Sequence, residues 1–114
     1  MSDDGWTPEA LGRDLAAAWS AQTSGKWRAD NPALGQCSVT ALAVQRLCGG
    51  EILKTPTPDG PHFYNLIGGV RHDFTASQFY RAPAYADLPS SAEEALADSS
   101  HAQLAALIRR LDRA

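Results

Sequence analysis

The chain is short of cysteine and of basic residues, and it contains no long apolar segment. Only two of its 114 residues are cysteines, and ten Lys and Arg stand against thirteen Asp and Glu, which gives a net charge of −3. No apolar run approaches the ~18 residues of a membrane span, and two cysteines are too few for a disulfide framework. The basic residues are scattered, apart from Arg109, Arg110 and Arg113, whereas nucleic-acid surfaces gather them. We therefore predict no membrane span, no disulfide framework and no nucleic-acid partner.

The length and the first residues indicate the domain organisation and the compartment. A chain of 114 residues suits one domain, 1–114, rather than two. Twenty of its fifty hydrophobic residues are alanine, so the core is small. The opening Met1-Ser2-Asp3-Asp4 is acidic where a secretory signal would be basic and then apolar. We therefore expect the protein in the reducing cytoplasm, where both cysteines stay free thiols.

Two segments in the first half have the spacing of helices. Thr7-Pro8-Glu9 has the residue types of a helix start, and apolar residues follow at helical intervals, which predicts a helix over about 8–20. The second predicted helix covers about 37–47, is apolar over much of its circumference and ends at Gly49-Gly50. This helix is expected to lie centrally, with Cys37 at its N-terminus.

After the second helix, the pattern changes to that of strands. Short stretches rich in aliphatic and aromatic residues predict strands at about 51–55, 62–67 and 70–74. A turn over 56–61 joins the first two strands, and Gly68-Gly69 is typical of a two-residue hairpin turn between the second and third.

The last third of the chain predicts loops and helices. We expect a short helical turn capped by Thr75, a loop over 80–89 and a short helix or helical turn within 90–97. Ser100 followed by Gln103 is a capping-box pattern for a final helix over about 101–113. The chain is thus expected to be α+β, with N-terminal helices packed on a small antiparallel sheet and a helix at the C-terminus.

Cys37 is the first candidate for chemistry, because it stands at a helix start. The partial positive charge and free N–H groups there favour a thiolate and can hold an oxyanion. Gly35 lets the backbone approach closely, and Gln36 offers a side-chain donor to the same oxyanion. The alternative interpretation is that Cys37 is a small buried core residue.

The predicted hairpin places a histidine beside an aspartate. Counting outward from Gly68-Gly69, Tyr64 faces Asp73, and His62 lies diagonal to Asp73 on the same side. Such a diagonal is ~7–8 Å between backbones, within side-chain reach. The other side of the hairpin collects an apolar set with two polar residues nearer an edge: Phe63, Ile67, Val70 and Phe74, with Asn65 and His72.

Together these residues have the composition of a Cys-His-Asp catalytic system. A carboxylate such as that of Asp73 fixes the tautomer of an imidazole such as that of His62 and stabilises its protonated form. The imidazole in turn activates a thiol such as that of Cys37. The alternative interpretation is an ordinary surface His-Asp pair.

A zinc site is the competing interpretation. Cys37, Cys48, His62 and His72 are zinc-type ligands, but no pair has a close C-x2-C or H-x3-H spacing. We therefore predict no metal and no other cofactor. His101 follows the cap of the last helix and is expected to be exposed.

Four pieces of the chain stand together in one order, namely 31–42 (NPALGQCSVTAL), 49–53 (GGEIL), 62–65 (HFYN) and 73–75 (DFT). This ordered combination, over about 31–79, resembles that of the YunG-like family of small uncharacterised bacterial proteins. More distantly, a helix-start cysteine followed by a histidine and an aspartate on adjacent strands is similar to the core of papain-like and transglutaminase-like thiol enzymes. That likeness implies a papain-like fold, with Cys37 as nucleophile, His62 as base and Asp73 as orienting residue.

We therefore expect a cysteine hydrolase or acyltransferase that acts on an amide, ester or thioester of a small molecule or peptide. Its predicted site consists of Cys37, His62 and Asp73, with Gln36 and Gly35 in support. The alternative is a binding or interaction module of the same fold without turnover. Such a module would pair through exposed aromatic residues, namely Trp6, Trp19, Trp27, Tyr80 or Tyr85.

Overall fold

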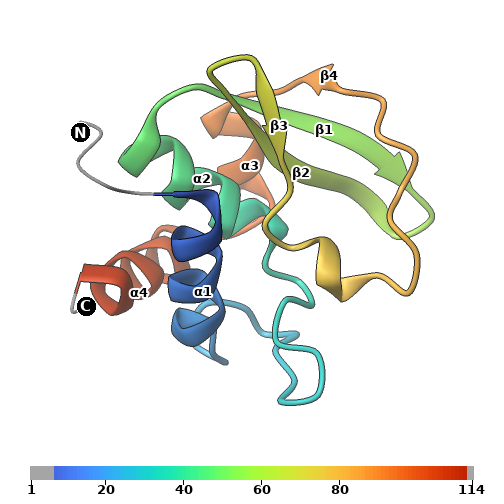
Figure 1. Ribbon diagram of the computed structural model, residues 1–114. Helices are drawn as coiled ribbons and strands as arrows, with labels where there is room; N and C mark the ends of the chain where they lie inside the picture. The colour runs from blue at the N-terminus through green and yellow to red at the C-terminus, as the bar shows by residue number, and fades with distance from the viewer. Residues whose placement is uncertain (1–6, 113–114) are drawn as a thin grey trace.

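Helix α2 lies at the centre of the fold, between an antiparallel sheet and the other helices (Figure 1). The structure is a computed structural model that describes residues 7–112. Within this range the chain is α+β, with four α-helices, one 3-10 helix and four strands. In chain order they are α1 (Pro8–Ala18), α2 (Cys37–Cys48), β1 (Glu51–Thr57), β2 (Gly60–Ile67), β3 (Val70–His72), η1 (Ala76–Gln78), β4 (Leu88–Pro89), α3 (Ala92–Ala97) and α4 (His101–Asp112).

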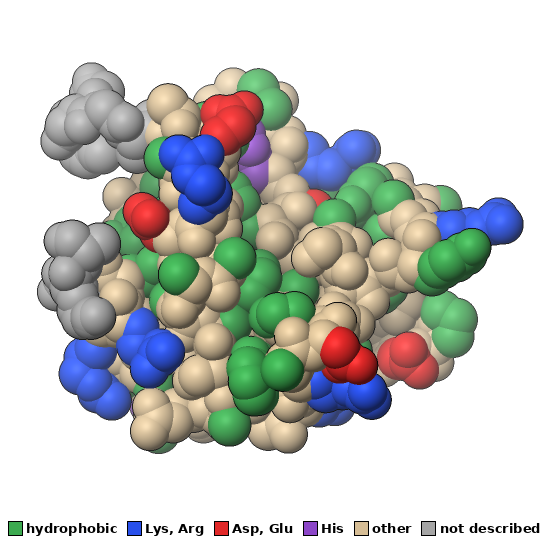
Figure 2. Space-filling view, turned by 60° about the horizontal axis from the view of Figure 1, so that its bottom comes forward, with side chains coloured by type: hydrophobic (Ala, Val, Ile, Leu, Met, Phe, Trp, Pro, Cys, Tyr) green, Lys and Arg blue, Asp and Glu red, His purple; other side chains and the backbone are tan. Residues whose placement is uncertain are grey.

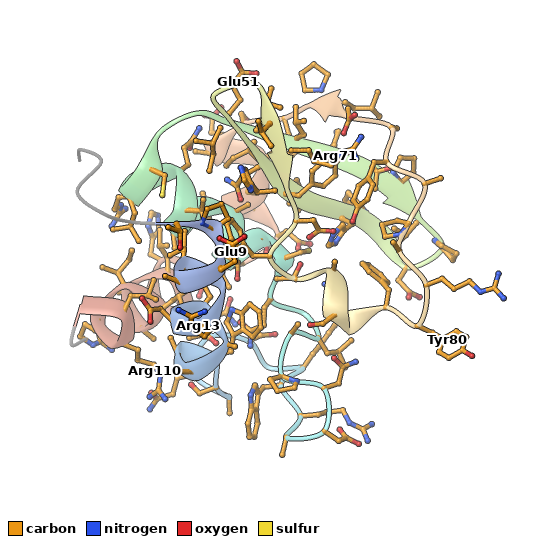
Figure 3. All side chains as sticks on the ribbon, viewed as in Figure 1. Glu9, Arg13, Glu51, Arg71, Tyr80 and Arg110 are labelled. Atoms are coloured by element: carbon orange, nitrogen blue, oxygen red, sulfur yellow. The ribbon has the colours of Figure 1, made fainter. Side chains whose placement is uncertain are left out.

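Helix α1 begins where the sequence predicts and ends earlier. The Thr7 hydroxyl accepts a hydrogen bond from Ala10 N at 3.0 Å, which caps the first turn. The helix ends at Ala18 because Trp19 is extended, with φ −62° and ψ 139°. Trp19 is buried and donates its indole N–H to the Thr40 hydroxyl at 2.9 Å, which ties the end of α1 to α2. Arg110 of α4 lies beside the same end of α1 (Figure 3) and donates to Ala18 O at 2.6 Å.

The sheet has the order β3-β2-β1-β4 and is antiparallel throughout. The predicted turn over 56–61 was too long, because Pro56 pairs with Pro61 and Thr57 pairs with Gly60. The Thr57 side chain closes the remaining two-residue turn, since its hydroxyl donates to Gly60 O at 2.7 Å and accepts from Asp59 N at 3.2 Å. Strand β4 was not predicted; it pairs with β1 inside the stretch expected to be a loop.

The β2–β3 hairpin has the predicted register. Leu66 pairs with Arg71 and Ile67 pairs with Val70 across Gly68-Gly69. Strand β3 nevertheless ends at His72, two residues before the predicted end. The reason is that the Asp73 side chain accepts a hydrogen bond from Thr75 N at 3.2 Å, which turns the backbone out of the ladder. The short helical turn that follows is η1, and the Thr75 side chain does not cap it.

Both faces of β2 are buried, which the alternation of the hairpin did not predict. Phe63 and Asn65 point toward α2, and Asn65 is 1% exposed rather than near an edge, with its Nδ2 donating to Ala41 O at 3.1 Å. His62 and Tyr64 point the other way and are covered by the segment 73–87. Val70, expected in the apolar set, is 55% exposed.

The face of the molecule in Figure 2 carries dispersed charge. On the face in Figure 2 the Lys and Arg side chains stand in separate groups, and no continuous basic patch joins them. Among residues 7–112, none of the helices combines the length and the apolar character needed to cross a membrane.

The position of Asn65 leads to a stability prediction. Asn65→Asp replaces a donor to Ala41 O by a buried carboxylate, so we expect a loss of about 3 kcal/mol or more in unfolding free energy at pH 7. Burial raises the pKa of such a carboxyl in the folded state, so the loss should shrink as the pH falls toward 4. Urea unfolding of wild type and Asn65→Asp at pH 7 and near pH 4 measures the loss in unfolding free energy. An equal loss at the two pH values would contradict the prediction.

Candidate active site

Cys37 is held at the first position of α2 by the loop that precedes it. Gly35 has φ +75°, and a Cβ there would lie 2.6 Å from Ser24 Oγ and 2.8 Å from Lys26 Cβ. Only glycine fits this contact without displacing the loop. The loop therefore fixes the position of Cys37 at the start of α2, where the first backbone N–H groups lack intrahelical acceptors.

His62 and Asp73 form the pair that the hairpin predicts. His62 Nε2 lies 2.7 Å from Asp73 Oδ2, and the two side chains are 2% and 5% exposed. Phe79 packs edge-on against the imidazole with ring centroids 4.7 Å apart. The pair is therefore buried, unlike the ordinary surface pair of the alternative interpretation.

The Asp73 carboxylate is supported by groups that the sequence did not single out. Its Oδ2 also accepts from the Tyr85 hydroxyl at 2.7 Å, and its Oδ1 accepts from Thr75 N at 3.2 Å and from Thr75 Oγ1 at 3.3 Å. Burial and the hydrogen bond to Asp73 raise the pKa of Tyr85, so its hydroxyl stays protonated and remains a donor. Because His62 Nε2 faces Asp73, Nδ1 is the ring nitrogen left to face the thiol.

The charge state of His62 follows from its two neighbours. Burial alone lowers the pKa of the imidazole, but hydrogen bonds to Asp73 and Cys37 and the charges of both raise it to about 9. At neutral pH the ring is therefore an imidazolium that is bound to the Asp73 carboxylate and lines the same cavity as the Cys37 thiol.

A second set of polar contacts holds Tyr85 in place. Arg71 forms two hydrogen bonds to Asp87, of 2.9 and 2.7 Å, and its guanidinium lies 4.4 Å from the centre of the Tyr85 ring. Tyr64 donates its hydroxyl to Asp87 Oδ1 at 2.9 Å and accepts from Asp87 N at 2.8 Å. Arg71 reaches this cluster from β3, over the sheet (Figure 3).

Thr55 of β1 attaches the same segment to the sheet on both sides of Tyr85. Its hydroxyl donates to Ala84 O and accepts from Ala86 N, each at 2.9 Å.

A cavity of about 540 Å³ opens beside Cys37 and His62. Its walls come from the loop before α2, the β1–β2 turn, η1 and the junction of α3 and α4. The lining includes Lys26, Gly35, Cys37, Thr57, Asp59, His62, Gln78, Phe79, Asp98 and Ser99. The thiol and the imidazole therefore lie in the cavity lining, whereas Asp73 does not.

Gln36 does not line this cavity, although the sequence suggested it as an oxyanion donor. Its side chain is fully buried in the loop before α2, where Oε1 accepts from Thr23 Oγ1 at 2.8 Å and Nε2 contacts Ser20 O at 3.5 Å. Gln36 is the N-cap residue of α2, but its side chain makes no capping hydrogen bond and is held in the preceding loop instead. Gln36 therefore stabilises the approach to Cys37 rather than facing a substrate.

The remaining candidates for chemistry lie apart from the cavity. Cys48 is at the other end of α2, and burial raises the pKa of its thiol. His72 stacks on Phe74 with ring centroids 5.8 Å apart, and His101 is exposed. Across residues 7–112, no group of three or more His, Cys, Asp or Glu side chains is placed to hold a metal ion.

The described aromatic residues of the interaction-module alternative range from buried to fully exposed. Trp19 is core, Trp27 packs partly buried against the core, and Tyr85 bonds Asp73. Tyr80 is fully exposed and projects away from the body of the protein (Figure 3). Trp6 lies outside the described residues.

Comparison with known proteins identifies relatives along most of the chain. The model of the family described as YunG protein matches residues 7–114. A protein of Bacillus subtilis (strain 168) named "Uncharacterized protein YunG" is 46% identical over 89 residues, which cover 78% of this chain and 77% of the relative. No solved structure matches the chain. These comparisons give no activity, so the chemistry follows from the geometry of the site alone.

The charge of His62 can be measured directly. We expect its ring signals in an NMR titration to give a pKa of about 9. Cys37→Ser and Asp73→Asn should each lower this pKa, because each removes a negative charge that stabilises the imidazolium. Cys48→Ser, at the far end of α2, should leave it unchanged. A pKa that is the same in all four proteins would show that neither partner acts on the ring.

Proposed function

The chain belongs to the YunG protein family, as its motifs predicted, and we propose that it is a cysteine hydrolase or acyltransferase of papain-like fold. The observation that carries the proposal is that Cys37 and His62 line one cavity while His62 is bound to the buried carboxylate of Asp73. The order of the elements also supports it. A cysteine starts the central helix, the histidine lies on an adjacent strand, and the aspartate directly follows the next one.

The proposed reaction begins with the Cys37 thiolate. Its sulfur attacks the carbonyl carbon of an amide, ester or thioester, a C–S bond forms, and the carbonyl π electrons move to oxygen. The Cys37 N–H at the start of α2 donates to this oxyanion. When the carbonyl re-forms, the bond to the leaving group breaks and the His62 imidazolium gives the leaving group its proton.

The acyl group then leaves Cys37 by the reverse sequence. Neutral His62 takes a proton from water, or from an acceptor amine, alcohol or thiol, which attacks the thioester carbon. The C–S bond breaks and the thiolate and imidazolium return. Water gives hydrolysis and another acceptor gives acyl transfer, with no metal or cofactor in either path. Asp73 accepts the hydrogen bond of His62 Nε2 and so keeps Nδ1 directed at the sulfur.

The cavity favours a small polar substrate or the end of a peptide. Lys26 on one wall and Asp59 and Asp98 elsewhere in the lining offer charges of both signs. The reducing cytoplasm is the compartment we propose, because a working site needs Cys37 as a free thiol.

The first test compares the two thiols. Iodoacetamide at pH 7 should alkylate Cys37 about tenfold or more faster than Cys48, because Cys37 is paired with His62 while burial raises the pKa of Cys48. His62→Ala should strongly slow the alkylation of Cys37. Asp73→Asn should slow it less, because the helix start still acts on the sulfur.

p-Nitrophenyl acetate should then place an acetyl group on Cys37, which mass spectrometry detects. A wild-type rate no higher than that of Cys37→Ser would leave the interaction module as the better explanation.

The second test concerns Tyr85 as a positioning residue. Tyr85→Phe keeps the ring against Tyr64 and Arg71 and removes the hydrogen bond to Asp73. We expect the rate constant for acylation to fall about tenfold with little change in KM, because a less fixed carboxylate leaves the imidazole less well directed. Tyr80→Phe is the matched control, since this exposed hydroxyl lies on the same segment. Equal acylation rate constants for Tyr85→Phe and Tyr80→Phe would show that Tyr85 does not position the catalytic residues.

A further inference from the structure

Two hydrogen-bond donors share one oxygen of the Asp73 carboxylate. His62 Nε2 and the Tyr85 hydroxyl both bond Oδ2, each at 2.7 Å. The other oxygen, Oδ1, accepts from Thr75 N at 3.2 Å and from Thr75 Oγ1 at 3.3 Å. The negative charge is therefore divided among four bonds. Because a donor draws electron density from the oxygen that it binds, a stronger bond from Tyr85 leaves a weaker bond to His62.

Arg71 acts on Tyr85 from the other side of its ring system. The carbon of the guanidinium lies 4.4 Å from the centre of the Tyr85 ring, where a cation is attracted by the π electrons. A nearby positive charge favours release of the phenol proton and so makes the hydroxyl a better donor. Burial and the hydrogen bond to Asp73 raise the pKa of Tyr85, and the charge of Arg71 acts in the opposite direction. Arg71 therefore strengthens the bond from Tyr85 to Asp73.

These contacts connect the surface of the protein with the buried imidazole. Arg71 is held on the sheet by two hydrogen bonds to Asp87, of 2.9 and 2.7 Å (Figure 3). Its side chain is 41% exposed, whereas that of His62 is 2% exposed. Neither Arg71 nor Tyr85 lines the cavity beside the thiol. Both residues are thus placed to act on His62 without touching a ligand in that cavity.

The other groups around His62 supply no competing cation. Tyr64 stacks on the imidazole with ring centroids 5.9 Å apart and is uncharged, because burial raises its pKa to about 12. Burial lowers the pKa of His62, while Asp73 and Cys37 raise it. Within residues 7–112, no Lys or Arg forms an ion pair with Asp73. A basic side chain therefore acts on this carboxylate through Tyr85.

We propose that Arg71, acting through Tyr85, limits how tightly His62 holds its proton and is thus a positioning residue of the site. The catalytic use of this effect rests on the proposed function, since His62 gives up this proton only if Cys37 is acylated. When the bond from carbon to the leaving group breaks, its electron pair stays on the leaving atom, which takes the proton from His62. A proton that is held less tightly is given up more readily.

The experiment measures the pKa of His62 by NMR titration of the full chain. Arg71→Met removes the cation at similar length and should raise this pKa by about 0.5. Arg71→Lys keeps a cation beside the ring, so its value should lie closer to that of wild type. Tyr85→Phe should also raise the pKa, because His62 then has no competitor at Oδ2. Arg81→Met removes an exposed cation from the same segment as Tyr85 and should change nothing.

The double variant Arg71→Met/Tyr85→Phe tests the route of the effect. If Arg71 acts through Tyr85, the double variant should have the same His62 pKa as Tyr85→Phe alone. An equal rise from Arg71→Met with and without the Tyr85 hydroxyl would mean that the guanidinium acts on His62 directly, which overturns the inference.

Three other results would also overturn it. They are an unchanged pKa in Arg71→Met, an unchanged or lower pKa in Tyr85→Phe, and the same rise in Arg71→Lys as in Arg71→Met. The last of these would mean that Arg71 acts only by holding Asp87 in place. None of them bears on the proposed function, which acetylation of Cys37 by p-nitrophenyl acetate in wild type tests separately. Absence of that acetylation, with the expected pKa values present, would reject the proposed function and still support the effect of Arg71 on His62.

Discussion

The buried carboxylate of Asp73 is the constraint on which the rest of the site depends. An ionised carboxylate without partners in a protein interior costs several kcal/mol, so it must be surrounded by donors. Here the donors come from β2 through His62, from the start of the next turn through Thr75, and from the distant segment 80–87 through Tyr85. Satisfying one carboxylate therefore brings together three stretches of chain. It also closes the outer face of β2, which would otherwise be open to water.

The closing segment needs its own attachment, and the polar contacts around Asp87 supply it. Asp87 has φ +53°, an uncommon conformation for a residue other than glycine. Hydrogen bonds from Arg71 and Tyr64 on neighbouring strands offset that cost. Arg71 pairs in the ladder with Leu66, so the register that places His62 near Asp73 also places Arg71 under Tyr85. Strand register, the closing segment and the histidine are thus set by the same hairpin.

The sequence predicted what depends on local periodicity and counting. Thr7 and the helix it caps, Gly68-Gly69 and the register beyond it, and the pairing of His62 with Asp73 all follow from positions close in the chain. Contacts between distant segments could not be read in this way. Tyr85 looked like a loop aromatic, Asn65 like an edge residue, and strand β4 is two residues long and exists only because β1 pairs with it. The end of β3 was missed because a side chain, Asp73, competes with the ladder for the backbone.

The two glutamines show the same limit at the site itself. Gln36 is adjacent to the thiol in sequence, but its side chain lies in the loop before the helix, where Thr23 binds it. Gln78 is far from Cys37 in sequence, but the turn that Asp73 starts carries it back to Gly35.

Linkage connects the chemistry of the site with the stability of the fold. The pKa of His62 is raised from 6.5 to about 9 in the folded protein, so the folded state holds this proton more tightly than the unfolded chain does. The stability that the protonated ring contributes is fully present below about pH 6.5 and is lost as the pH rises through about 9. The same proton is the one that His62 gives to the leaving group in the proposed reaction. Alkaline pH therefore removes the general acid and weakens the attachment of Asp73 in one step, because both depend on a single buried imidazolium.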